Sequence, residues 1–110
     1  MKVKYRVKDK QEFQDIYKKG IRLNFEFVKA RYLANKLSYS RVGISVPTKC
    51  GNAVIRNKIK RQIRAVLAHK MNFTQPIDII IVATTNYSVM NFEKVNADLT
   101  ELLKKVGNIS

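Results

Sequence analysis

Six polar side chains between residues 56 and 64 have the chemistry to bind phosphate groups. On a helix, at about 100° per residue, Arg56, Lys60 and Arg64 follow one another at intervals of one turn. The full set is Arg56, Asn57, Lys58, Lys60, Arg61 and Arg64. Like charges one turn apart repel by about a few tenths of a kcal/mol per pair, and no Asp or Glu lies between Phe27 and Ile77 to relieve this. A solvated helix face is the simpler interpretation, but uncompensated cations favour an external polyanion.

Two aromatic side chains could contribute a second kind of contact. Phe13 and Tyr17 lie one turn apart in segment 10–19, which Asp9 as N-cap and Gly20 as terminator bound as a helix. Aromatic rings flanked by Lys and Arg stack on unpaired bases. The same spacing also suits two core residues, and both interpretations stay open at this point.

Groups for catalysis by the chain itself are missing from the sequence. A hydrolase needs a nucleophile with a base, paired carboxylates or a metal cluster. The single Cys50 and single His69 have no partner visible in the sequence, and Asp98 and Glu101 have the spacing of a solvated helix face. We expect Cys50 to be a small residue at a strand-to-helix turn. The sequence therefore predicts a binding surface with no catalytic residue and no metal site.

The net charge of +14 on 110 residues is unevenly distributed. Residues 1–70 carry 19 Lys or Arg against 4 Asp or Glu, whereas residues 71–110 carry 3 against 4. The surface that binds the polyanion therefore lies in the first two thirds of the chain. We expect the chain to be a single RNA-binding domain, residues 1–110. The chain has neither a membrane-length apolar run nor a signal peptide, so we expect no membrane partner and a cytoplasmic location.

The elements that position these groups follow from apolar spacing and turn residues. Helices are predicted at 10–19, 53–69 and 92–106, the last between an Asn91 cap and Gly107, and strands at 21–24, 25–33, 41–46 and 77–83. Asn35–Ser38 has the composition of a hairpin loop. The apolar run Ile77–Ala83 suggests a central strand covered on both faces.

Two of these elements have a distinctive face. In the long helix, a core-facing stripe is predicted at Ile55, Ile59, Ile63 and Val66. In strand 41–46, Gly43 and Ser45 point away from the apolar side, and such small groups allow something large to approach the backbone. The helix that connects this strand to 77–83 would normally make a right-handed crossover.

The segment Gly51–Arg61, together with Arg64, resembles the signature of the bacterial ribonuclease P protein subunit. The strand 41–46 before it, the helix pattern Glu12–Gly20 and the strand 76–82 match that family in order and spacing. The resemblance thus covers nearly the whole chain. It implies an α+β fold, a two-layer α/β sandwich of αβββαβα order shared with a ribosomal protein domain, in which the crossover through the long helix is left-handed.

The resemblance also implies a role in removing the 5′ leader of precursor tRNA. In that family the ribonuclease P RNA is the catalyst, Mg²⁺ is bound mainly by the RNA, and one protein per RNA raises the affinity for precursor tRNA. The six polar residues of the long helix would contact the catalytic RNA and the region near the cleavage site. A cleft for the single-stranded leader would be lined by Phe13, Tyr17, Tyr32, Ser45 and Lys49.

Four positions depart from the family pattern. Lys58 replaces an Arg and keeps the charge without the planar fork, and Pro47-Thr48 replaces a Ser and a Lys. A cleft Tyr of the second strand falls at Ala30, and Tyr32, two residues further on, is its substitute.

Two competing functions differ from this one in class. A ribosomal or general RNA-binding structural protein would need no leader cleft, and its Phe13 and Tyr17 would be plain core. A DNA-binding regulator is disfavoured because Asn57 and Gln62 are the only neutral polar side chains beside the Arg and Lys residues that could read base edges.

Overall fold

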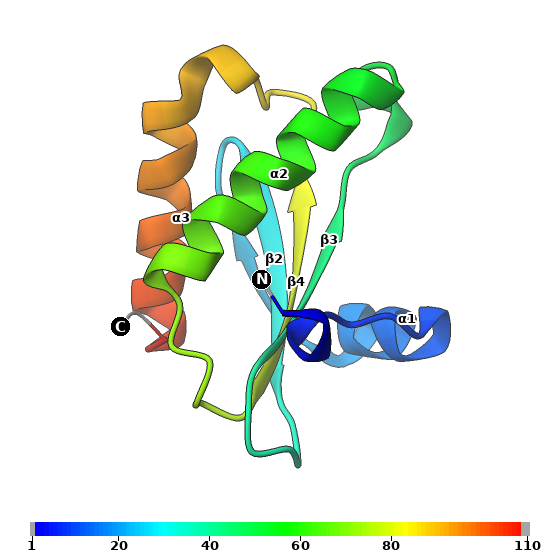
Figure 1. Cartoon of the computed structure of the whole chain (residues 1–110), viewed down its shortest axis with the longest axis vertical. Coiled ribbons are helices and arrows are strands. Elements are labelled where there is room, and N and C mark those ends of the chain that lie inside the picture. The colour runs from blue at the N-terminus through cyan, green and yellow to red at the C-terminus, as the bar shows by residue number, and fades with distance from the viewer. Residues whose placement is uncertain (1, 109–110) are drawn as a thin grey trace.

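The computed structural model describes residues 2–108 and contains the predicted order of elements (Figure 1). The helices are α1 (Lys10–Lys19), α2 (Ala53–Lys70) and α3 (Phe92–Val106), and the strands are β1 (Ile21–Asn24), β2 (Val28–Ala34), β3 (Arg41–Ser45) and β4 (Ile77–Ala83). Short 3-10 turns lie at Val3–Tyr5, Thr48–Cys50 and Val89–Asn91. The αβββαβα order is confirmed. None of the described helices has both the length and the apolar character needed to cross a membrane.

The four strands form one mixed sheet in the order β1-β2-β4-β3. β4 pairs antiparallel with β2 and parallel with β3, so it is central, as its apolar run predicted. The prediction of a hairpin at Asn35–Ser38 is wrong, because β4 lies between the two strands that this segment connects. An apolar strand gains most where both of its faces are covered, and this places β4 between β2 and β3.

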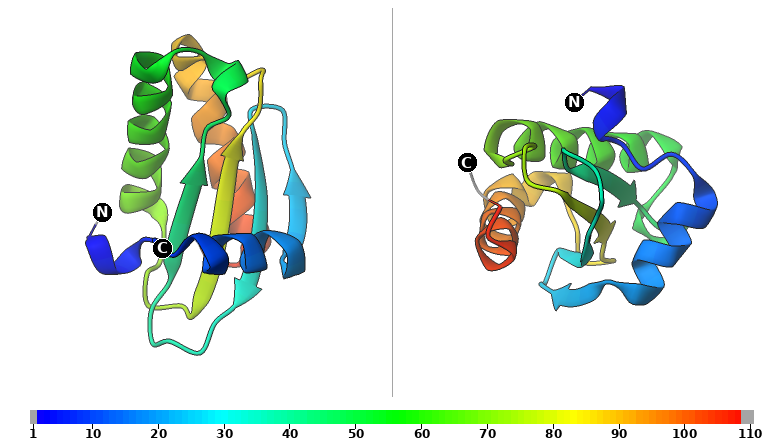
Figure 2. Two further views of the ribbon diagram at one scale, coloured as in Figure 1. Left: turned by 90° about the vertical axis from the view of Figure 1, so that its right-hand side faces the viewer. Right: turned by 90° about the horizontal axis from the view of Figure 1, so that it is seen from below.

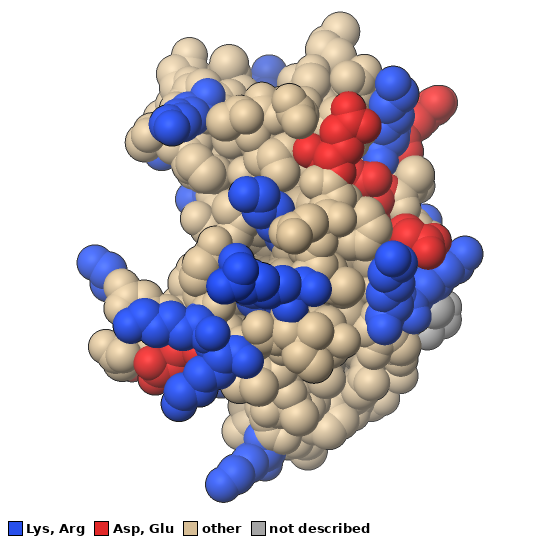
Figure 3. All heavy atoms as spheres, turned by 180° about the vertical axis from the view of Figure 1, so that it is seen from behind, with Lys and Arg blue, Asp and Glu red and all other residues tan. Residues whose placement is uncertain are grey.

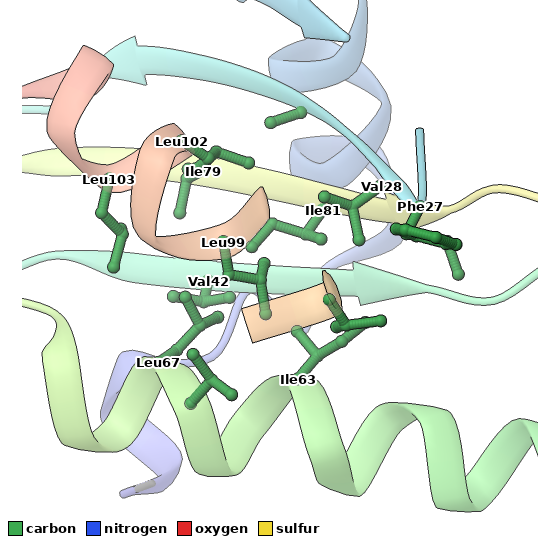
Figure 4. Close-up of a cluster of buried hydrophobic side chains, with 14 of the residues drawn as sticks. Phe27, Val28, Val42, Ile63, Leu67, Ile79, Ile81, Leu99, Leu102 and Leu103 are labelled. Carbon is green, nitrogen blue, oxygen red and sulfur yellow. The ribbon is translucent and has the colours of Figure 1, made fainter. Parts of the chain in front are cut away.

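Helices α2 and α3 cover one face of the sheet, and α1 crosses the other (Figure 2). The core lies between the sheet and the α2–α3 layer (Figure 4), with Ile63, Leu67, Ile79, Leu99 and Leu103 fully buried. The sheet and the α2–α3 layer together form the predicted two-layer sandwich. On the opposite side α1 adds a partial third layer, and this layer positions the candidate site.

The core stripe of α2 is shorter than predicted. Ile59, Ile63 and Val66 are buried, but Ile55 is 38% exposed. The first turn of α2 extends past the sheet, and there Ile55 lies over the backbone of Gly51. Helical periodicity correctly predicted which side of α2 faces the core. The length of the stripe that is buried depends on how far the sheet extends beneath the helix.

Two polar predictions at α3 are also wrong. The side chain of Asn91 makes no capping hydrogen bond; instead Ser88 accepts one from the N–H of Met90 in the preceding turn. Asp98 is not part of a solvated face, because its carboxylate accepts a hydrogen bond from the N–H of Phe27 at 3.0 Å. This contact fastens α3 to the loop that leads into β2.

Candidate RNA-binding surfaces

Helix α1 is seated on the sheet through Phe13 and Gly43. A Cβ atom added to Gly43 would lie 2.8 Å from the Phe13 ring and 2.6 Å from the side chain of Ile80. The large group that approaches this small-residue face is therefore Phe13 itself. Only a glycine allows the ring to lie this close to the strand, and Ser45, two residues along the same face, stays uncovered by the ring.

An ion-pair network also attaches α1 to the sheet, next to the contact between Phe13 and Gly43. Arg41 on β3 donates to both carboxylate oxygens of Asp78 on β4, at 3.0 and 2.8 Å, and lies 2.8 Å from the carboxylate of Glu12 on α1. Asn35 also donates to Asp78. The hydrogen bonds with Asp78 raise the pKa of Arg41 above its ordinary value. Glu12 lies three residues after the cap Asp9, the spacing of a capping box, but its side chain instead ties α1 to the sheet.

A groove runs over the sheet beside α1. Its first part has a volume of about 270 Å³ and is lined by Phe13, Gln14, Tyr17, Lys18, Ser45 and Val82. Its second part has a volume of about 600 Å³ and reaches from Lys29 and Val82 to the Pro47–Lys49 turn and the 84–86 loop. Val82 lines both parts. The floor is one register row, in which Ser45, Val82 and Lys29 lie on neighbouring strands. We call this feature the sheet groove.

The sheet groove has cations along its borders. Figure 3 shows the surface hollowed between α1 and the start of α2, with Lys and Arg side chains on both sides of the hollow, whereas most of the Asp and Glu in view gather over α3. Lys18 contributes from the α1 side, Lys29 from the floor, and Lys49 from the far end. Among the lining residues Glu26 is the single carboxylate, so a polyanion that enters the groove meets more positive than negative charge along its path.

Tyr17 presents an exposed ring at the side of this groove. The ring is 37% exposed, and the guanidinium carbon of Arg31 lies 4.2 Å from its centroid. Arg31 also donates to the backbone carbonyl of Tyr17 at 3.0 Å. The stacked Arg31 fixes the orientation of the ring, which suits a platform for stacking on an unpaired base.

The six polar residues of α2 form a second basic surface, the basic face of α2. Asn57, Lys58 and Arg61 are exposed, whereas Arg56, Lys60 and Arg64 are half-buried. Among the described residues both ion pairs belong to Arg41, so no carboxylate neutralises this face. Arg64 also lines a pocket of about 180 Å³ with Arg6, Phe13 and the edge of β3, which brings the face close to α1.

Cys50, the single thiol of the chain, is engaged in structure. The thiol of Cys50 donates to the carbonyl of Thr84 at 3.3 Å, and burial raises its pKa. Within residues 2–108 no group of three or more His, Cys, Asp or Glu is placed to hold a metal ion. The described surfaces are therefore suited to bind an anionic chain.

Comparisons with known proteins show the family of this protein. A family model described as Ribonuclease P matches residues 1–107. The chain belongs to the ribonuclease P protein family. It is 40% identical to the ribonuclease P protein component of Streptococcus agalactiae serotype III, over 99% of this chain and 100% of that protein. It is therefore a component of ribonuclease P, a tRNA-processing ribonucleoprotein and endoribonuclease, and this implies association with the ribonuclease P RNA.

Solved structures agree with this assignment. The RNase P protein of Staphylococcus aureus superposes with a TM-score of 0.82 at 36% identity, over 93% of this chain and 94% of that one. The RNase P protein of Thermotoga maritima superposes with a TM-score of 0.79 at 29% identity, over 91% and 96%. The fold described above is thus the ribonuclease P protein fold.

Four of the five cleft residues expected for a ribonuclease P protein lie together, and one does not. Phe13, Tyr17 and Ser45 line the first part of the sheet groove and Lys49 lines the second. Tyr32 lies on the opposite face of the sheet, in register with the buried Ile79, and packs against the core. Tyr32 cannot substitute for a cleft Tyr, and Ala30, on the same face, is buried in that core as well.

Sequence reasoning missed three cations of this ribonuclease P protein. Lys29 lies in the floor of the sheet groove, Arg31 stacks on Tyr17, and Arg6 lines the pocket beside Arg64. The alternation of strand 28–34 could have placed Lys29 and Arg31 together on the face opposite the apolar residues. The position of Arg6 depends on a long-range contact that no local pattern reveals.

Proposed function

We propose that this chain binds two RNAs through two neighbouring surfaces. The basic face of α2 binds the ribonuclease P RNA, and the sheet groove binds the single-stranded 5′ leader of precursor tRNA, whose endonucleolytic removal gives the mature 5′ end. The observation that carries the proposal is the seat of α1, which holds an exposed aromatic ring beside a sheet floor bordered by Lys18, Lys29 and Lys49. A groove that combines stacking rings with scattered cations suits single-stranded RNA of varied sequence.

The division of labour between the two surfaces follows from their shapes. The basic face of α2 is convex and carries point charges and guanidinium groups, which contact phosphates without reading bases. The sheet groove is concave and partly apolar, so it can hold individual unpaired nucleotides. Because Arg64 and Phe13 line one pocket, the two RNAs meet beside the start of α1.

The cleavage chemistry is assigned to the RNA subunit, with Mg²⁺ bound mainly by that RNA. Within residues 2–108 no three Asp, Glu, His or Cys side chains are grouped to hold a Mg²⁺ ion, and Asp78 and Glu12 both turn to Arg41. The protein's part is to bind and orient the substrate, and its side chains take no part in the chemical step.

Further features of the assembly belong to the same proposal. We infer that the β3–α2–β4 crossover is left-handed, as in the ribosomal protein domain. Its support is that α2 lies in front of the sheet in Figure 1, while β4 lies to the left of β3 and the two parallel strands both point upward. We also propose that one protein binds one RNA and that the complex works in the cytoplasm.

Tyr17→Ala tests the leader-binding role. In complexes with ribonuclease P RNA, this variant should bind leader-bearing precursor tRNA more weakly by about 1–3 kcal/mol, the value of one stacked base, with mature tRNA binding unchanged. Tyr17→Phe keeps the ring and should bind as the wild type does. Phe92→Ala, an exposed aromatic on α3, is the matched control. Equal losses for precursor and mature tRNA would return Tyr17 to a structural role and favour a general RNA-binding protein.

A further inference from the structure

From Lys29 in the floor of the sheet groove, a set of cations continues onto the ribbon formed by β1 and β2. Arg22 lies directly opposite Arg31, and Asn24 lies opposite Lys29. Because residues paired across antiparallel strands share a face, these side chains lie on the face that α1 crosses. We call Arg22, Lys29 and Arg31 the β1–β2 strip.

The β1–β2 strip is electrostatically unfavourable by itself. Like charges directly opposite each other in a sheet destabilise the pair. Among residues 2–108 no carboxylate forms an ion pair with any of the three, since both ion pairs belong to Arg41. Arg22 and Lys29 are exposed, and the Nε of Arg31 is buried without a hydrogen-bond partner. An anion placed here would relieve the repulsion.

The β1–β2 strip continues the sheet groove. The floor row Ser45–Val82–Lys29 extends in register to Asn24 on the edge strand. This row crosses three interstrand gaps of about 4.8 Å, so it spans about 14 Å from β3 to β1. Two residues along β2 from Lys29, Arg31 stacks on Tyr17. This contact joins the strip to the aromatic part of the groove. Helices α2 and α3 cover the other face (Figure 2). Arg31 is half-buried beside α1, whereas Arg22 and Lys29 are exposed and stay open to a ligand.

We propose that the β1–β2 strip binds phosphates of the leader nucleotides that lie farther from the cleavage site than those in the sheet groove. The inference rests on the proposed function. The basic face of α2 adjoins the β3 edge through the Arg64 pocket, so a strand that starts there and crosses the sheet reaches β1 last. Arg and Lys contacts to phosphate carry no base information, so the strip responds to leader length and not to leader sequence.

The test is a leader-length series with the reconstituted ribonuclease P complex. Precursor tRNAs whose leaders are lengthened one nucleotide at a time are titrated against the wild type and the double variant Arg22→Ala, Lys29→Ala. Wild-type affinity should rise a second time once the leader reaches the strip. The double variant should lose that second rise, on the order of tenfold, and its salt slope should fall by roughly 0.7 per lost contact to single-stranded phosphate.

Three controls keep the outcome interpretable. The charge-preserving variant Arg22→Lys, Lys29→Arg should retain the second rise, and Lys94→Ala, an exposed cation on α3, should behave as the wild type does. The unfolding midpoint of the double alanine variant should not fall, because a like-charge pair has been removed. Its fold is thereby checked independently of RNA binding.

The possible results separate this inference from the proposed function. If the double variant keeps the second rise, or loses affinity equally for mature tRNA, the β1–β2 strip does not bind the leader. If Tyr17→Ala in that case still weakens the binding of precursor tRNA and leaves the binding of mature tRNA unchanged, the proposed function stands and only this inference falls. If neither variant responds to the leader, both fall together.

Discussion

Replacing Gly43 by Ala should disturb the seat of α1 and, through it, leader binding. The new Cβ would lie 2.6 Å from Cδ1 of Ile80 and 2.8 and 2.9 Å from two ring carbons of Phe13. Favourable contacts between carbon atoms are about 3.5–4.0 Å long. Ile80 is fully buried and its Cδ1 has little room to shift, whereas the half-buried Phe13 ring can move away from the strand.

The size of the effect follows from this overlap. One extra methyl group in a well-packed site costs typically about 1–3 kcal/mol, and we expect a loss of that size in the free energy of unfolding, measured by urea titration. Because the displaced ring lines the sheet groove, precursor tRNA binding should weaken while mature tRNA binding stays constant. In a double-mutant cycle, Phe13→Ala should remove the part of the cost of Gly43→Ala that comes from the ring, and the overlap with Ile80 should remain.

Gly107→Ala provides a control of similar cost at a distant place. Gly107 has φ of 75° and no atom within 4 Å of a built Cβ, so Ala there costs about 1–2 kcal/mol of backbone strain without reaching the groove. It should lower stability and leave leader binding unchanged. If Gly43→Ala is as stable as the wild type, or if both glycine variants affect leader binding alike, the seat of α1 does not control the groove.

Other predictions concern charge and burial. Asp78→Ala leaves Arg41 without its buried partner and should lower the free energy of unfolding by about 3–5 kcal/mol, whereas Glu12→Gln, on the exposed arm, should cost less than about 1 kcal/mol; equal costs in urea titrations would contradict this ranking. Burial raises the pKa of Cys50, so native Cys50 should react more slowly with a thiol reagent at alkaline pH than unfolded protein. Equal reaction rates of the native and the unfolded protein would mean that the thiol is open to solvent. Since the unfolded thiol ionises more readily, the free energy of unfolding should also fall as the pH rises through the ordinary pKa of the Cys50 thiol. For the basic face of α2, the slope of log affinity for ribonuclease P RNA against log salt should fall by roughly one per lost phosphate contact on neutralising Arg56, Lys60 and Arg64, and an unchanged slope would mean that they do not touch phosphate.

Local patterns predicted the elements well because their signals are local. The limits of α1 follow from Asp9, which caps it through two backbone N–H groups, and from Gly20. The apolar run 77–83 gave both the limits and the central place of β4. The αL conformation of Gly107 ends α3 as its position predicted. Each of these features depends on a few neighbouring residues.

What the sequence could not supply is which distant residues meet. The contact between Arg31 and Tyr17 joins residues 14 apart, and the pair between Arg41 and Asp78 joins residues 37 apart. The misplacement of Tyr32 has the same origin. Strand alternation correctly put it on the face of Ala30, but only the packing of α1 determines which face of the sheet borders the groove.

The central claim is that this protein assists an RNA catalyst. The most direct test is cleavage of a precursor tRNA at low Mg²⁺ by a bacterial ribonuclease P RNA, with the protein present or absent and with the protein alone. We expect the protein to stimulate cleavage only together with the RNA and to be inactive alone. Cleavage by the protein alone would contradict the assignment of catalysis to the RNA, and tight RNA binding without stimulation would contradict the proposed role in leader removal.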